Sequence, residues 1–212
     1  MDDHLLRFDK EKVYCFIDFE TENLCLNNSH NLPWQVAMIK AVDGKKIDEK
    51  NFYVKWPRQV NVSKEAARIT RFNLKKYEEI AVPHDQIFPT VEDWLDNSDY
   101  VLGHNILGFD LYLIKDFYKE MGKDYKHLVE KMIDTMCVAR GIKYDERIKD
   151  DENFLAWQYK MLHTHRKGVK TNLTALGKEF DIQHNYEKLH NAIVDLELNL
   201  KVWNKLKWMI DV

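Results

Sequence analysis

Two acidic side chains, Asp18 and Glu20, stand at the end of an apolar stretch that begins at Val13. The stretch predicts a β-strand over residues 13–19, and residues two apart in a strand project from the same face of the sheet. Two neighbouring carboxylates repel each other and are costly to bury unless a cation neutralises them. Because Mg²⁺ and Mn²⁺ prefer oxygen ligands, the pair predicts a site for a divalent cation.

A third acid, Asp110, follows a short apolar stretch at residues 100–104 and a loop at residues 105–109. One interpretation is an ordinary acid at the start of a helix, where the helix dipole favours negative charge. The other is a metal ligand, because a residue that follows a buried strand lies at the edge of the sheet, within reach of Asp18.

His190 and Asp195 form the last pair. Five residues of a regular helix rotate a side chain by about 140°, so the two cannot face one site from the same helix. The spacing therefore predicts that His190 lies in a loop and Asp195 in the first two turns of the helix that follows. A histidine above a metal site is suited to act as a general base, although most single histidines are surface residues.

Together the four carboxylates and the histidine predict hydrolysis of a phosphodiester by two metal ions about 3.5–4 Å apart. We expect Mg²⁺, with Mn²⁺ able to replace it. Asp18 would bridge the ions and Glu20 would orient the attacking water. Asp110 and Asp195 would anchor the ions from other elements, and His190 would take the proton of the water.

The remaining pattern predicts an α/β protein whose mixed, five-stranded sheet is flanked by helices on both faces. Asp43 and Gly44 form a strong hairpin turn signal, and an asparagine-rich loop (Asn23, Asn27, Asn28 and Asn31) follows the first strand. The expected strands are residues 13–19, 34–42, 47–55, 100–104 and 132–135. The expected helices are residues 63–68, 84–96, 111–122, 153–162 and 172–180, together with a short helix after residue 135 and a long one within residues 186–210.

Composition limits the classes of protein. The 212 residues have a formal net charge of −3, with 45% hydrophobic and 32% charged residues, which excludes a strongly basic nucleic-acid coat protein. We expect a single domain over residues 1–212, with a charged insertion at about residues 141–171. Three cysteines without CxxC spacing, no membrane-length apolar segment and an acidic start (Met1 to His4) predict a cytoplasmic protein without a membrane partner.

Three segments, in order, resemble known motifs. Residues 18–21 (Asp-Phe-Glu-Thr), 105–110 (Asn-Ile-Leu-Gly-Phe-Asp) and 190–195 (His-Asn-Ala-Ile-Val-Asp) are similar to the three motifs of the DEDDh branch of the DnaQ-like 3′→5′ exonucleases. The resemblance covers about residues 12–206 and implies an RNase H-like fold. Glu22 and Asn23 depart from it, because the family often has Thr-Gly there.

The resemblance also implies contacts with the substrate. The backbone around Phe19 and the side chain of Thr21 would contact the terminal nucleotide. Ile106 and Leu107 would wedge against its base, and Asn105 would support the loop. The alternative for the apolar residues is ordinary core packing.

The densest cationic run, residues 163–170, contains Arg166 and Lys167, which we expect to hold the phosphate backbone of the incoming strand. The alternative is a solvated surface loop. A zinc site formed by His163, His165 and Cys137 is a weaker hypothesis, because no metal-ligand spacing supports it.

These expectations give a 3′→5′ exonuclease that releases nucleoside monophosphates from single-stranded DNA, in proofreading or repair, with a polymerase or another replication protein as a partner. An exoribonuclease on the same fold remains an alternative, because no motif reads the 2′-hydroxyl. A non-catalytic nucleic-acid-binding subunit is the other alternative, and the complete set of five catalytic residue types weighs against it.

Overall fold

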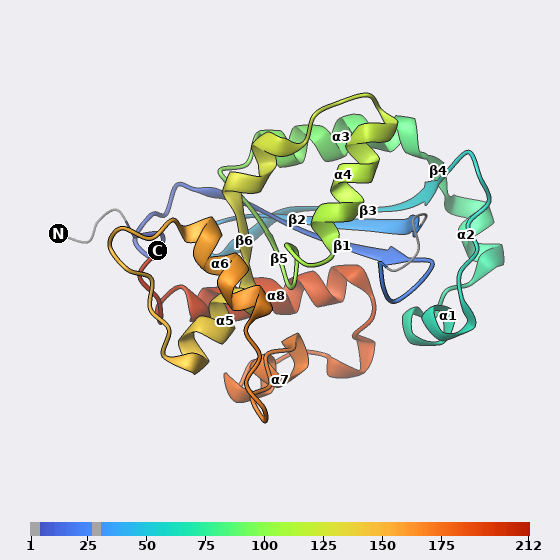
Figure 1. Cartoon of the computed structure of the whole chain (residues 1–212). Coiled ribbons are helices and arrows are strands. Elements are labelled where there is room, and N and C mark those ends of the chain that lie inside the picture. Colours follow the sequence, from blue (N-terminus) through green and yellow to red (C-terminus); the bar gives the residue numbers. More distant parts are fainter. Residues whose placement is uncertain (1–4, 27–30) are drawn as a thin grey trace.

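The computed structural model describes residues 5–26 and 31–212, so Met1 to His4 and the loop residues Asn27 and Asn28 lie outside the described part. Within that part, six strands form one mixed sheet in the order β4-β3-β2-β1-β5-β6, with helices on both faces (Figure 1). The strands are β1 Val13–Thr21, β2 Pro33–Val42, β3 Lys45–Lys55, β4 Val82–Pro83, β5 Tyr100–Gly103 and β6 Met132–Asp134. The α/β fold class is confirmed, and the sheet has one strand more than the sequence predicts.

The helices follow the sequence pattern in most places. They are α1 Lys64–Thr70, α2 Leu74–Ile80, α3 His84–Asp96, α4 Asp110–Glu120, α5 Thr135–Tyr144, α6 Phe154–His163, α7 Leu173–Glu179 and α8 Ala192–Leu206, with 3₁₀ turns η1 Lys126–Lys131 and η2 Tyr186–Lys188. No helix in the described part is long and apolar enough to cross a membrane.

Strands β1, β2 and β3 form an antiparallel meander. The β2–β3 turn contains Asp43 and Gly44, both with positive φ (50° and 70°), as the hairpin signal predicts. Strand β5 pairs with β1 in parallel, and β6 pairs with β5 in parallel. The unpredicted strand β4 has only two residues and pairs with the end of β3, so it is too short to show an alternating pattern.

The two faces of the sheet have separate cores. On one face, Ile17, Val36 and Met38 pack with residues of α3 and α4, and on the other face Tyr14 and Phe16 pack with α5, α7 and α8. Figure 1 shows α3 and α4 on one side of the sheet and α5, α7 and α8 on the other. Every second residue of β1 therefore lies beneath α8, as the period of a strand requires.

Helix α8 covers this second core. The helix begins at Ala192, within the expected range, and His190, with a positive φ of 67°, lies in the loop before it. Trp203 of α8 packs on the sheet, with its ring centroid 6.2 Å from that of Tyr14. Further along the same face of β1, the strand presents Asp18 and Glu20 beside the first turns of α8.

Candidate active site

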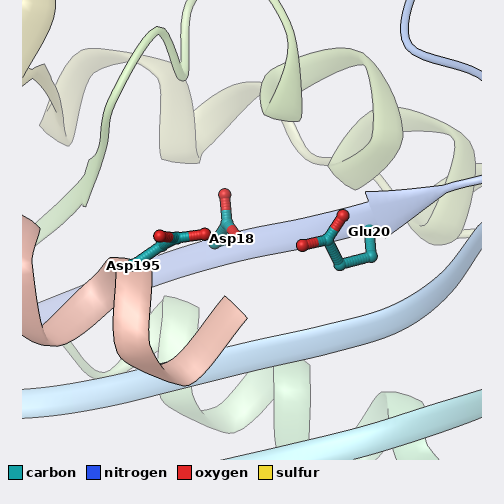
Figure 2. Close-up of side chains that lie close together, drawn as sticks. All are labelled: Asp18, Glu20 and Asp195. Atoms are coloured by element: carbon teal, nitrogen blue, oxygen red, sulfur yellow. The ribbon is translucent and has the colours of Figure 1, made fainter. Parts of the chain in front are cut away.

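Three carboxylates meet where β1 passes the beginning of α8. Each of Asp18, Glu20 and Asp195 offers an oxygen atom, and these atoms all lie within 4.8 Å of one another. Figure 2 shows Asp18 and Glu20 on the same strand, with Asp195 reaching toward them from the neighbouring helix. All three side chains are partly buried. This separation is short enough for one cation to contact several of them.

The fourth predicted carboxylate, Asp110, is the first residue of α4 and is 4% exposed. The backbone N–H groups of Phe19 and of Asp110 itself oppose the rise in the pKa of this carboxyl. Its Oδ1 atom is buried and has no hydrogen-bond partner in the described part of the chain. Asp110 lies outside the 4.8 Å group, but its charge is close enough to affect Asp18 and Glu20.

The acids have pKa values far above their ordinary range. Burial, followed by the charges of Asp110, Glu20 and Asp195, holds the pKa of Asp18 well above its usual value. Burial and the charges of Asp195 and Asp110 raise the pKa of Glu20 to about 8. Burial is also the main reason that the pKa of Asp110 rises to about 8 and the pKa of Asp195 to about 7.

These shifts and the unpartnered Oδ1 of Asp110 fit a cation site. Four carboxylates in a partly dry space repel one another, and a divalent cation would favour the charged form of each. The residues that could hold it are Asp18, Glu20, Asp110 and Asp195. Within the described residues no histidine or cysteine joins the three-acid group, so the donor set is oxygen only, which suits Mg²⁺ or Mn²⁺.

His190 lies in the loop immediately before α8, as the spacing predicts, and its side chain is exposed. Its backbone N–H donates to Oδ2 of Asp195 over 3.1 Å. This hydrogen bond ties the histidine loop to a carboxylate of the site and slightly opposes the rise in the pKa of Asp195.

Asp134 is a residue of this region whose role the sequence analysis did not identify. Its carboxylate is fully buried and accepts hydrogen bonds from the backbone N–H groups of Asn105 (2.9 Å) and Leu107 (3.2 Å). It also accepts hydrogen bonds from the backbone N–H groups of Met136 and Cys137 at the start of α5. It thereby fixes the loop that leads into Asp110. The available signal is an aspartate just before an expected helix, the pattern of an N-cap.

The sequence and the fold both match known exonucleases. A family model described as "Exonuclease" matches residues 15–203. The chain belongs to this exonuclease family. The RNase H-like fold that the three motifs imply is thereby confirmed, whereas assignment to the DEDDh branch stays a prediction. No curated protein matches the sequence significantly.

Solved structures of exonuclease I have the same fold as this exonuclease domain. The complex of E. coli Exonuclease I with a dT13 oligonucleotide has a TM-score of 0.72 and 18% identity, over 94% of this chain and 42% of that chain. The dA16 complex of the same enzyme has a TM-score of 0.73 and 18% identity, over 94% of this chain and 41% of that chain. A product-bound exonuclease I has a TM-score of 0.69 and 19% identity, over 92% of this chain and 43% of that chain. The chain spans about two fifths of the length of these structures.

The loop after the first motif of the exonuclease domain is held by Glu22, where the sequence departs from the family pattern. Glu22 is 2% exposed, forms an ion pair of 2.6 Å with Arg58, and accepts the backbone N–H of Leu32 over 3.1 Å. The hydroxyl of Thr21 donates to the carbonyl of Asn23 over 2.6 Å. Buried hydrogen bonds therefore fix this loop in place of a flexible glycine.

The predicted substrate contacts differ in their accessibility. Ile106 and Leu107 are both 0% exposed, which supports the core-packing alternative for them. Phe19 and Thr21 are each 5% exposed. Asn105 has a positive φ of 69° and supports its loop through the bond to Asp134 described above.

Arg166 is occupied by neighbouring groups. Its guanidinium donates to the carbonyl of Tyr144 (2.9 Å) and to Glu146 (3.2 Å), and it lies 4.7 Å from the centroid of the Tyr144 ring. Lys167 is exposed. Cys137 is buried, and within the described residues it forms no metal-ligand group with His163 and His165. The zinc hypothesis has no support from this arrangement.

Proposed function

We propose that this exonuclease domain is a DEDDh-type, two-metal 3′→5′ exonuclease that releases nucleoside 5′-monophosphates from single-stranded DNA. The observation that carries the proposal is the meeting of Asp18, Glu20 and Asp195 within 4.8 Å, beside the buried Asp110 with its unpartnered oxygen. Membership of the exonuclease family supports hydrolysis from a strand end. The titles of the similar E. coli structures name complexes with dT13 and dA16, which supports DNA as the substrate.

The four carboxylates would hold two Mg²⁺ or Mn²⁺ ions together with a phosphate of the substrate. Bound ions of this kind activate a water molecule and stabilise the charge that develops on the phosphate and on the leaving oxygen. The chain contributes the negative charge and the partly dry surroundings. Because burial raises the pKa of each acid, loading the ions releases protons, and this release couples ion binding to pH.

His190 is the proposed general base. Its exposed side chain is accessible to the attacking water, and its backbone N–H bond to Asp195 holds the loop beside the carboxylates. Asp195 therefore has two tasks, since it contributes a ligand oxygen and positions the base.

Substrate binding involves the residues around the site. We infer that Phe19, Thr21 and Asn105 line the place of the terminal nucleotide. Ile106 and Leu107 support it from the core, because neither has exposed surface. In the basic run, Lys167 is accessible to phosphate, whereas Arg166 would have to leave Glu146.

Two wider parts of the proposal concern the whole protein. We propose one catalytic domain over residues 1–212, in which residues 141–171 form an insertion that includes α6. A role in proofreading or repair beside a polymerase is the partner hypothesis. RNA remains the second candidate substrate, because no residue of the site is assigned to the 2′-hydroxyl.

A labelled-strand assay tests the proposal. DNA and RNA strands of equal sequence, labelled at the 5′ end, are incubated with the protein in Mg²⁺, Mn²⁺ or EDTA. We expect stepwise shortening from the 3′ end in either metal, none in EDTA, and faster shortening of DNA. Absence of metal-dependent shortening on both strands would refute the exonuclease activity.

Variants locate the activity. Asp18→Ala should abolish shortening while strand binding remains measurable. The matched control is Asp116→Ala, because Asp116 is an exposed acid of α4, the helix that Asp110 begins. Full activity in Asp18→Ala would show that the metal site is elsewhere.

A further inference from the structure

A pocket of about 400 Å³ lies beside His190, between the loop that carries this residue and the turn from α1 to α2. Pockets for small ligands occupy roughly 300–1,000 Å³, so a mononucleotide has a suitable size. None of the four carboxylates of the active site lines the pocket. Two residues on its rims, Arg71 and His190, have positive φ values of 57° and 67°, a strained backbone that is common around binding sites.

The floor of the pocket continues the row of side chains that contains Glu20. Glu20 pairs with Gln35 on β2, and Gln35 pairs with Tyr53 on β3. Residues directly opposite each other on antiparallel strands project from the same face. Since Gln35 and Tyr53 both line the pocket, it opens beside the active site on the same face of the sheet.

The pocket is cationic, although the whole chain has a net charge of −3. Arg71, Lys76 and Lys188 line it, and none of its described lining residues is an aspartate or a glutamate. None of the three cations takes part in an ion pair within residues 5–26 and 31–212. Such a cluster favours a ligand with a phosphate group.

Three aromatic side chains lie among these cations. The ring of Trp34 is 5.7 Å from that of Tyr53 and 4.9 Å from that of Phe72, and all three residues line the pocket. Lys76 lies 5.5 Å from the centroid of the Tyr53 ring. Aromatic groups stack on nucleobases of any sequence, so cations beside aromatic rings match the two parts of a nucleotide.

The position of His190 indicates which nucleotide this is. In an in-line displacement, water attacks from the side opposite the leaving oxygen. The leaving oxygen belongs to the shortened strand, so the general base, and the pocket that it lines, lie on the side of the phosphate away from that strand. The detached nucleotide can move into this pocket without passing the shortened strand. We propose that this pocket binds the released nucleoside 5′-monophosphate on its way out of the active site. This assignment rests on the proposed function, which makes that nucleotide the product.

The test uses binding without turnover. Thymidine 5′-monophosphate, thymidine and inorganic phosphate are titrated into the full chain by calorimetry in EDTA, which removes the divalent cations through which the active site would hold a phosphate. We expect the monophosphate to bind and thymidine to bind about tenfold more weakly or worse, because it lacks charge-assisted hydrogen bonds. Inorganic phosphate should compete weakly. No binding of the monophosphate, or equal binding of thymidine, would overturn the proposal.

Charge variants locate the binding. Lys76→Glu combined with Lys188→Glu should weaken binding of the monophosphate about tenfold or more, and Lys188→Arg should retain it. Lys126→Glu is the matched control, because Lys126 is an exposed lysine of η1 that does not line the pocket. Equal loss in the control would contradict the assignment.

The two proposals fail in different ways. A protein that binds the monophosphate in EDTA but shortens no strand would contradict the exonuclease activity and leave the nucleotide pocket standing. A protein that shortens strands but binds no monophosphate in EDTA would contradict only the pocket.

Discussion

Replacing Glu20 with glutamine should stabilise the metal-free protein while it abolishes activity. Burial and the neighbouring acids raise the pKa of Glu20 from an ordinary value of 4.5 to about 8. An acid with a raised pKa binds its proton more tightly in the folded state. The contribution of Glu20 to the free energy of unfolding is therefore greatest below pH 4.5, falls as the pH rises toward 8, and then levels off.

The size of the effect follows from the shift. At pH 7 ionisation of this one group has lowered the free energy of unfolding by about 3.5 kcal/mol, since the pH is 2.5 units above the ordinary pKa and each unit corresponds to about 1.4 kcal/mol. Glutamine cannot ionise, so Glu20→Gln should recover about that amount in EDTA. For a domain of this size the gain corresponds to roughly 7–14 °C in Tm.

Thermal unfolding in EDTA between pH 5 and pH 8, repeated with Mg²⁺, measures the difference in Tm between Glu20→Gln and the wild type. We expect Mg²⁺ to raise the Tm of the wild type more than that of Glu20→Gln, because the variant lacks one ligand. The matched control is Glu120→Gln, at an exposed position at the end of α4. This variant should change neither the Tm in EDTA nor the rise in Tm with Mg²⁺. A Glu20→Gln variant no more stable than the wild type at pH 8 in EDTA would refute the reasoning.

Three further outcomes are expected. His190→Ala should lower kcat on labelled strands about 10²- to 10⁴-fold, the usual contribution of a general base, with the Mg²⁺-induced rise in Tm intact; loss of that rise would instead make His190 a ligand. Asp134→Ala should cost about 2–4 kcal/mol in the free energy of unfolding by denaturant, because four backbone N–H groups, all at least partly buried, lose their acceptor; an unchanged midpoint would contradict this. Gly108→Ala should lower kcat up to about 10²-fold in the strand assay with a smaller change in Tm, because its Cβ would meet Oδ1 of Asn105 and shift the loop before Asp110; full activity would show that the loop absorbs the methyl group.

The local sequence determined the parts of the site that depend on the period of one element. Strand alternation placed Asp18 and Glu20 on one face, and helical rotation placed His190 outside the helix that carries Asp195. The hairpin turn at Asp43 and Gly44 followed from the need for positive φ, which few residues tolerate. Each of these results depends on geometry within a few residues, so no knowledge of distant contacts was needed.

Other features depended on partners far away in the chain. The sequence did not predict α2 or the two-residue strand β4, which forms by pairing with the end of β3. It also did not show that Glu146 and Tyr144 occupy Arg166, or that Ile106 and Leu107 have no exposed surface. Charge and hydrophobicity are visible in a sequence, whereas accessibility is a property of the packed molecule.

The sequence by itself determined which side chains could bind a metal and, through the three motifs, the fold that carries them. Only the tertiary structure decided that Asp195 meets Asp18 and Glu20, because α8 packs across β1 and begins at that point of the strand. It also gave Asp134 its role in fixing the loop before Asp110. The hydrogen bonds that its carboxylate accepts come from that loop and from the start of α5. The pKa shifts of the acids arise in the same way, from burial and from charges that are brought together only when the chain folds.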